Sequence, residues 1–137
     1  MKIKYTRELL ERMNLFLRAT GAGLKDCFEG EDTLYFVVEN GEIGKAIGKG
    51  GIIVKELQNK LQRKIRIIEF HPDAAEFVKN VIYPLTVDGV EVHGTIVVVH
   101  SLDRNTKGLL IGRNAKNLNM LTKVVQRYFT VDEIKVE

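Results

Sequence analysis

Apolar side chains recur at helical spacing near the start of the chain, at Leu9, Leu10, Met13, Phe16 and Leu17. This period of three to four residues predicts an amphipathic helix that Thr6 caps and that ends near Gly21. Residues 24–28 and 33–38 follow, and the second stretch is rich in β-forming side chains. Because the two stretches flank a turn-forming sequence at residues 30–32, they indicate a hairpin of two strands.

The chain continues with a short helix, a glycine-rich loop, a longer helix and a strand. We expect the short helix over residues 42–47, and the loop runs from Gly48 to Gly51. The longer helix is indicated by four apolar residues that share one face: Ile53, Val54, Leu57 and Leu61. With a strand at residues 65–70, the order of elements in this half of the chain is α-β-β-α-α-β.

The second half of the chain repeats the first. Shifting the sequence by 64 positions aligns Gly30 with Gly94, Gly44 with Gly108, Ile47 with Ile111, Gly48 with Gly112, Leu57 with Leu121, and Arg63 with Arg127. Shared glycines are informative because glycine occupies backbone positions that need unusual angles or close approach. We infer two copies of one small fold.

The helices of the second copy follow the same order. Pro72 and Asp73 mark the start of a helix that continues to Ile82, because proline suits a first helical turn and aspartate is a good cap. Asp103 caps a short helix. The longer helix is indicated by an apolar stripe formed by Leu118, Leu121, Val125 and Tyr128.

Strands complete the second copy at residues 90–92, 95–99 and 130–136. The expected fold class is therefore α+β, with one domain at residues 1–70 and another at residues 71–137. Each domain is expected to have a three-stranded mixed sheet with helices packed on one face.

The composition narrows the class of protein. With 137 residues and 45% hydrophobic content, the chain can bury a packed core and is not expected to be disordered. It has no run of about 20 apolar residues, as a membrane helix needs, and its first five residues lack the apolar core of a signal peptide. We therefore expect a cytoplasmic protein with no membrane contact.

Residues with catalytic or metal-binding chemistry are sparse and scattered. The single cysteine, Cys27, excludes an internal disulfide and is interpreted as a core residue. His71, His93 and His100 lack the short spacing that builds metal sites. No triad or carboxylate pair suggests catalysis, so we expect no metal, no cofactor and no enzymatic activity.

Basic residues are concentrated in two segments, although the net charge of the chain is only +3. Residues 43–66 hold seven lysines and arginines against one glutamate, and residues 104–127 hold six with no acid, so each segment carries +6. Two such segments imply two surfaces that face a polyanion. The basic cluster of Lys60, Arg63, Lys64 and Arg66 has two interpretations, a solvated helix end or a phosphate contact.

The glycine loop at residues 44–52 does not fit the known nucleotide-binding motifs. A phosphate-binding loop needs one more residue between its first two glycines and a hydroxyl residue after the lysine, where this chain has Gly50. A dinucleotide-binding fingerprint would follow a strand and be followed by an acidic residue about 20 positions later. Here the loop joins two helices, which argues against both.

A helix-GxxG-helix arrangement with a basic residue in the loop suits the backbone of RNA. Glycines allow close approach, and the amino end of the next helix attracts phosphate, so the bases can turn toward an adjoining apolar groove. The candidate RNA-binding residues are Ile43, Lys45, Ala46, Ile47, Gly48, Lys49, Gly50, Gly51, Ile53, Lys55 and Ile67 in the first copy, and Lys107, Ile111, Gly112, Arg113, Asn114, Ala115 and Lys116 in the second.

The run Ile47-Gly48-Lys49-Gly50-Gly51-Ile52-Ile53 resembles the I-G-x-x-G-x-x-I signature of KH domains, and the order of elements resembles their type II form. The tandem arrangement, with a second motif at residues 110–118, is similar to the paired KH domains of NusA-type transcription factors. Because nothing precedes or follows the pair, we expect the short archaeal type without the polymerase-binding and S1 domains of bacterial members. The resemblance implies binding of single-stranded RNA during transcription elongation, termination or antitermination.

The second motif departs from the pattern because Ala115 stands at its last position. Alanine can fit here if this residue is already helical, and Asn114 tolerates left-handed angles. The added methyl group would hold the RNA backbone farther away, so we expect weaker binding by the second copy. Gly108 and Gly112 have an alternative interpretation, since they could serve tight helix packing alone.

A second function from a different class also fits the sequence. The folds could be a protein-interaction module that contacts RNA polymerase or other transcription factors and makes little contact with RNA. We favour RNA binding because the basic segments coincide with the glycine loops, which a protein partner alone would not require.

Overall fold

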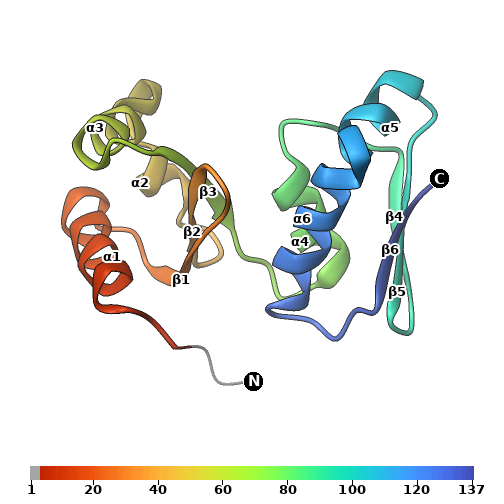
Figure 1. Cartoon of the computed structure of the whole chain (residues 1–137), viewed down its shortest axis with the longest axis horizontal. Helices are drawn as coiled ribbons and strands as arrows, with labels where there is room; N and C mark the ends of the chain where they lie inside the picture. The colour runs from red at the N-terminus through yellow and green to blue at the C-terminus, as the bar shows by residue number, and fades with distance from the viewer. Residues whose placement is uncertain (1–3) are drawn as a thin grey trace. The chain divides into compact units, whose positions relative to one another are not determined.

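The computed structural model describes residues 4–137, so Met1–Ile3, on which part of the signal-peptide argument rests, lie outside the described residues. The chain divides into two compact units, of which the first ends at Phe70 and the second is His71–Glu137. Each unit has its own three-stranded sheet, and Figure 1 labels the elements. No helix within residues 4–137 is long and apolar enough to cross a membrane.

The first unit has the expected order of elements. It consists of α1 (Arg7–Thr20), β1 (Leu24–Glu29), β2 (Thr33–Val38), α2 (Ile43–Ile47), the 3₁₀ turn η1 (Lys49–Gly51), α3 (Ile52–Leu61) and β3 (Lys64–Glu69). Strand β2 lies in the middle of the sheet, antiparallel to β1 and parallel to β3. The sheet is therefore mixed, as the sequence predicts.

The second unit repeats this topology. Its elements are α4 (Ala74–Ile82), β4 (Gly89–His93), β5 (Ile96–His100), α5 (Arg104–Ile111), the 3₁₀ turn η2 (Arg113–Ala115), α6 (Lys116–Gln126) and β6 (Glu133–Val136). Strand β5 pairs antiparallel with β4 and parallel with β6. The predicted α+β class, with two mixed sheets and helices, is confirmed.

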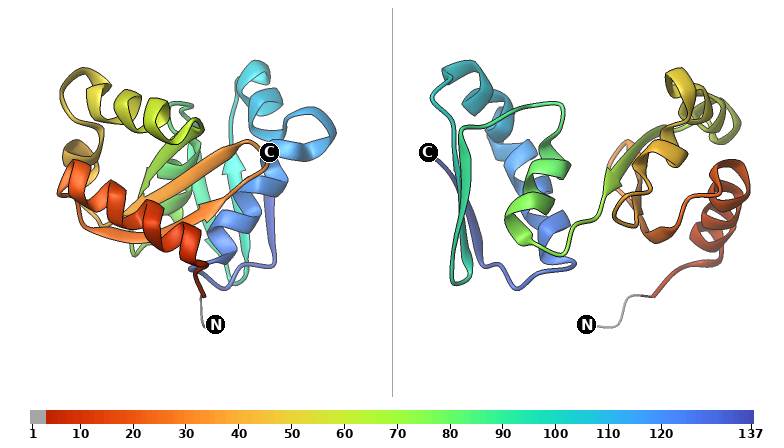
Figure 2. Two further views of the ribbon diagram at one scale, coloured as in Figure 1. Left: turned by 60° about the vertical axis from the view of Figure 1, so that its left-hand side comes forward. Right: turned by 180° about the vertical axis from the view of Figure 1, so that it is seen from behind.

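The core of the first unit lies between its sheet and the helices that cover one face (Figure 2). Phe16 of α1 stacks on Phe36 of β2, with ring centroids 4.3 Å apart, and Cys27 is fully buried beside them. The apolar stripe of α1 is narrower than its sequence predicts. Leu10 and Leu17 are 47% and 40% exposed, because only one edge of the stripe packs on the sheet.

The core of the second unit forms in the same way between its sheet and α4 and α6. Phe77 of α4 meets Tyr128 edge to face at 5.3 Å, and the alternate residues Val97 and Val99 of β5 are fully buried. Leu121 and the two valines before Gln126 complete the buried face of α6. The alternation along β5 shows that the helices cover one face of this sheet.

Three predicted boundaries of the second unit are wrong. Strand β6 begins at Glu133 rather than residue 130, and Thr95 Oγ1 donates to the carboxylate of Asp132, the residue just before it, at 2.7 Å. Helix α6 ends before Tyr128. Pro72 lies before α4 and not in its first turn. The cap of α4 is Asp73, and the Asp73 carboxylate accepts a hydrogen bond from the Glu76 N–H at 3.1 Å.

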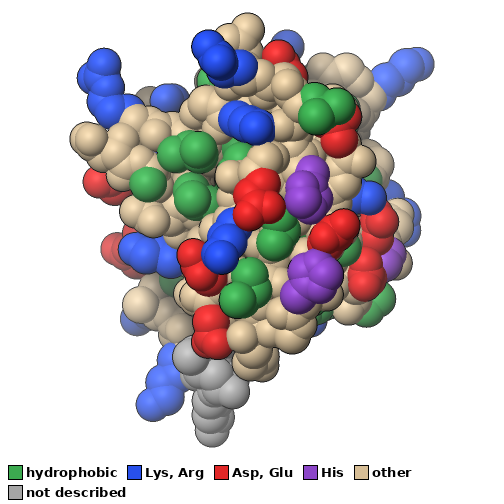
Figure 3. Space-filling view, turned by 90° about the vertical axis from the view of Figure 1, so that its right-hand side faces the viewer, with side chains coloured by type: hydrophobic (Ala, Val, Ile, Leu, Met, Phe, Trp, Pro, Cys, Tyr) green, Lys and Arg blue, Asp and Glu red, His purple; other side chains and the backbone are tan. Residues whose placement is uncertain are grey.

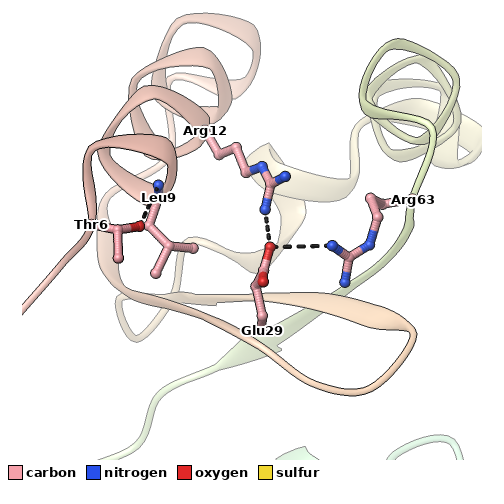
Figure 4. Close-up of polar contacts among 5 residues, drawn as sticks. All are labelled: Thr6, Leu9, Arg12, Glu29 and Arg63. Atoms are coloured by element: carbon pink, nitrogen blue, oxygen red, sulfur yellow. Dashed lines mark hydrogen bonds and ion pairs between the residues drawn. The ribbon is translucent and has the colours of Figure 1, made fainter.

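Ion pairs join separate elements of the first unit at its hairpin. The carboxylate of Glu29 accepts hydrogen bonds from Arg12 of α1 and from Arg63, at 3.1 Å, beside β3 (Figure 4). Lys64 lies 3.6 Å from Asp32. Two members of the basic cluster at the end of α3, Arg63 and Lys64, therefore have a structural role, because they pair with acidic residues of the hairpin.

The two glycine loops have the same backbone conformation. Gly48 and Gly112 have φ/ψ of 73°/176° and 74°/172°, a region that is essentially restricted to glycine. A Cβ at Gly48 would lie 2.7 Å from the side chain of Ile53, and one at Gly112 would lie 2.7 Å from Asn117. Gly108 has open space around its Cβ position, so the packing interpretation of that glycine is wrong.

The last two positions of each loop are left-handed. Gly50 and Gly51 have φ of 66° and 71°, and Asn114 and Ala115 match them at 56° and 59°. Asn114 has the left-handed angles that asparagine tolerates. Ala115 is left-handed too and not yet in a right-handed helix, so the condition under which alanine was expected to fit is not met. Left-handed alanine carries a backbone cost of roughly 1–2 kcal/mol, which the second unit tolerates.

We expect Ala115→Gly to raise the free energy of unfolding by about 0.5–1 kcal/mol, because removing the methyl group relieves the left-handed strain more than it costs in chain entropy. Gly51→Ala is the reciprocal change, and a Cβ there would touch nothing within 4 Å, so strain alone should lower stability by a similar amount. Urea denaturation followed by circular dichroism measures both. Shifts of the same sign would contradict the shared conformation.

We expect Glu29→Gln to lower stability at neutral pH by roughly 0.5 kcal/mol, the size typical of exposed ion pairs. Hydrogen bonding to Arg12 holds the pKa of Glu29 below its usual range. The stabilisation of the fold by the Glu29 carboxylate is thus fully present above the pKa of this group in the unfolded chain. It is lost as pH falls through the lower pKa of the folded state. Urea titrations at neutral and acidic pH should show the difference between variant and wild type shrinking in acid. Glu39→Gln, at an exposed carboxylate of the same unit, is the control and should show no such trend.

Candidate nucleic-acid interface

The tips of the two loops present basic and small polar residues to solvent. Lys49 and Gly50 are exposed in the first loop, and Arg113 and Asn114 are exposed at the equivalent positions of the second. The 3₁₀ turns are closed by hydrogen bonds from Gly51 N to Gly48 O at 3.3 Å and from the Ala115 N–H to the carbonyl of Gly112 at 3.2 Å. Each tip thus exposes one cation on a turn that a backbone hydrogen bond closes.

The helices that follow the loops start without a side-chain cap. Thr6, Asp73 and Asp103 cap α1, α4 and α5 through hydrogen bonds to backbone N–H groups, but no side chain caps α3 or α6. The short α2 also lacks a cap, since the carboxylate of Glu42 accepts from Gly23 N instead. Uncapped N–H groups and the positive end of the helix dipole attract anions.

The apolar candidates differ in how much surface they offer. Ile47 and Ile111, immediately before the loops, are 39% and 36% exposed. Ile43, Ile53 and Ile67 are partly buried and pack against the core of the first unit. Ala46 is fully buried, so the expectation that it lines a groove is wrong: its side chain supports α2 from the inside.

The basic candidates lie along the helices on either side of the loops. Lys45 pairs with Glu42 at 3.5 Å, whereas Lys55 and Lys107 take part in no ion pair within residues 4–137. Lys116 is exposed at the first position of α6. Cations in these positions can contact successive phosphates of a strand that follows the loop.

One residue that positions the second loop was not singled out from the sequence. Asn117 donates from Nδ2 to the carbonyl of Leu109 at 2.7 Å, which fastens the start of α6 to the end of α5. The equivalent residue of the first copy is Ile53, which packs against the core instead. The repeat of 64 residues contains the signal, since it aligns the apolar Ile53 with the polar Asn117 at the second position after each loop.

The histidines lie away from the loops. Glu91 and His93 of β4 are joined at 2.9 Å, and His100 of β5 lies 3.5 Å from the same carboxylate. Figure 3 shows histidine and acidic side chains together on the outer side of this sheet. Hydrogen bonding with His93 holds the pKa of Glu91 below its usual range, and the nearby His100 lowers it further. Within residues 4–137, no group of three or more His, Cys, Asp or Glu side chains is suited to hold a metal ion.

Comparison with known proteins places both units in context. The KH domain family matches residues 74–137, which is the unit that carries Ala115. The crystal structure of a protein called APE1850 has a TM-score of 0.77 to this chain at 29% identity, covering 97% of this chain and 100% of that one.

Archaeal relatives match nearly the whole chain. A Methanococcus vannielii protein described as a probable transcription termination protein NusA is 34% identical over 99% of this chain and 80% of its own length. The Halobacterium salinarum protein of the same description is 32% identical over 99% of both chains. On this likeness over nearly its whole length, the chain belongs to the archaeal NusA family.

Proposed function

We propose that the chain binds single-stranded RNA through two KH domains, at residues 1–70 and 71–137, whose glycine loops hold the sugar-phosphate backbone. One observation carries the proposal. Two loops of matching backbone conformation each place an exposed cation, Lys49 or Arg113, directly before a helix whose first N–H groups have no side-chain cap.

Such a loop offers phosphate several kinds of attraction at once. Gly50 has no side chain, and a Cβ there would meet no atom within 4 Å, so a phosphate can approach the exposed backbone of the first loop closely. The amino end of α3 or α6 supplies N–H groups and a partial positive charge, and the loop cation adds a full charge. These contacts position the strand without reading its sequence.

Exposed apolar residues beside the first loop favour a single strand over a duplex. Ile47 is 39% exposed beside the half-buried Ile43, Ile53 and Ile67. In a single strand the bases can turn away from the backbone and contact such a surface, whereas in an A-form duplex they are stacked and paired. Single-stranded RNA is therefore the ligand that both the loop and its apolar surroundings fit.

The biological setting of this binding follows from the relatives. Because they are described as probable transcription termination proteins, we propose that this chain contacts nascent RNA during elongation, termination or antitermination. The proposal includes a cytoplasmic location and a role without catalysis. Binding would act through the position of the transcript, not through chemistry on it.

We expect Gly50→Asp to weaken the binding of single-stranded RNA by about tenfold or more, the equivalent of about 1.4 kcal/mol, because a carboxylate at the tip repels phosphate. Gly50→Asn is the matched control, since the second loop already has asparagine at this position with nearly the same backbone angles. Fluorescence anisotropy with single-stranded RNA, single-stranded DNA and duplex RNA of equal length measures the effect. The double variant Lys49→Asp with Gly50→Asp should bind more weakly still.

Equal affinity of the wild type for single and double strands, with no difference between Gly50→Asp and Gly50→Asn, would contradict the proposal. Circular dichroism controls for folding. A Cβ at Gly50 meets no atom within 4 Å, and both asparagine and aspartate tolerate left-handed angles. The two variants therefore differ in charge alone.

A second function, binding to RNA polymerase or another transcription factor, is favoured by exposed apolar residues at α5. Leu102, just before this helix, is 92% exposed, and Leu109 on it is 57% exposed. A partner that covered both leucines would remove their apolar area from water, which favours association. We expect immobilised protein to retain purified polymerase after ribonuclease treatment and in high salt, and Leu102→Ser with Leu109→Ser to lose it. Retention that depends on RNA would contradict a direct contact.

A further inference from the structure

The first residues of α3 and α6 occupy equivalent positions but differ in chemistry. Ile52 and Lys116 directly follow the two loops, with φ/ψ of −63°/−38° and −59°/−45°. Because the preceding loop angles also match, the two side chains leave the backbone in the same direction relative to their loops. A ligand held on either loop therefore meets an isoleucine in one copy and a lysine in the other.

Exposed apolar surface lies on both sides of the first loop. Ile52 is 55% exposed at the start of α3, and Ile47 is 39% exposed at the end of α2. The core of the first unit does not require Ile52, since Leu57 and the half-buried Ile53 form the inner face of the same helix. An isoleucine in this position gains free energy only when a ligand covers it.

The surroundings of the second loop are more basic. Residues 104–126 carry five lysines and arginines and no acid, whereas residues 43–61 carry four lysines and one glutamate. In the first unit, Lys45 also pairs with Glu42, and Arg63 and Lys64 pair with acids of the hairpin. Within residues 4–137, no such pair engages Arg104, Lys107 or Arg113.

We propose, on the basis of the RNA-binding function above, that the two loops hold RNA by different forces. The second loop provides most of the ionic contact with phosphates, through Arg113 and Lys116. Ile47 and Ile111 offer similar apolar contact beside the two loops, and the first loop gains through Ile52 a further apolar contact with the sugars and bases that the second loop lacks. Ile52 and Lys116 are thus the residues that set how each copy responds to salt.

The response of binding to salt tests this division. For a single strand, the logarithm of the binding constant falls with the logarithm of salt concentration, with a slope of about −0.7 for each phosphate neutralised. We expect Lys116→Ile to make this slope shallower by about 0.7 and Ile52→Lys to make it steeper by about 0.7. Anisotropy titrations of the full chain with one single-stranded RNA, between about 50 and 200 mM salt, give the slopes.

Matched controls separate local contact from general charge. Lys135→Ile, on β6, removes the same charge from an exposed position away from the loops, and it should change the slope much less than Lys116→Ile. Asn114→Asp should flatten the slope, because the remaining binding then rests on the first loop. Gly50→Asp also adds a carboxylate that repels phosphate, but it should flatten the slope less than Asn114→Asp does, because the first loop makes fewer of the ionic contacts.

The outcomes distinguish failure of this inference from failure of the proposed function. If the wild type shows no preference for single strands, and if Gly50→Asp and Asn114→Asp bind RNA as tightly as the wild type, then RNA binding at the loops is wrong. The inference fails with it. If the wild type binds single strands, but Lys116→Ile and Lys135→Ile change the slope equally or Ile52→Lys leaves it unchanged, the division between loops alone is overturned. Circular dichroism of each variant verifies folding before its slope is used.

Discussion

The positive φ angles at the helix-to-helix turns are the constraint on which the rest of the candidate interface depends. At Gly48 the chain must leave α2, reverse its handedness and enter α3 within four residues, and it does so with angles that side chains disfavour. This turn points the amino end of α3 outward without a capping side chain. A residue with a Cβ at this position would move Ile53, and with it the inner face of α3.

The second unit keeps this geometry with residues less suited to it, which shows how strongly the surrounding structure determines the turn. Asn114 and Ala115 adopt left-handed angles that glycine would adopt at lower cost. Asn117 contributes to holding them by bridging to the carbonyl of Leu109, a contact that Ile53 cannot make in the first unit. The two copies therefore reach one backbone shape through apolar packing in one case and a hydrogen bond in the other.

Most of the fold could be predicted from local pattern, because helical periodicity, β-rich stretches and cap residues are properties of neighbouring positions. Thr6, Asp73 and Asp103 cap the helices that they were expected to cap. The failures concern residues whose state is set at a distance. Ala46 is buried by contacts with other elements, and Asp132, just before β6, accepts a hydrogen bond from Thr95, which lies 37 positions earlier in the chain. The candidate loop residues could be identified by their glycine spacing. The absence of a side-chain cap on α3 and α6 could not be predicted in this way.

The complete burial of Cys27 gives the chain an intrinsic reporter of its own opening. This residue is the only cysteine among 137 residues, and its side chain lies in the core of the first unit. A thiol reagent cannot reach it while that core is closed, so the rate of labelling follows the opening of this unit alone. The second unit contains no thiol and gives no labelling signal. The local stability of the first unit can therefore be followed without any engineered probe.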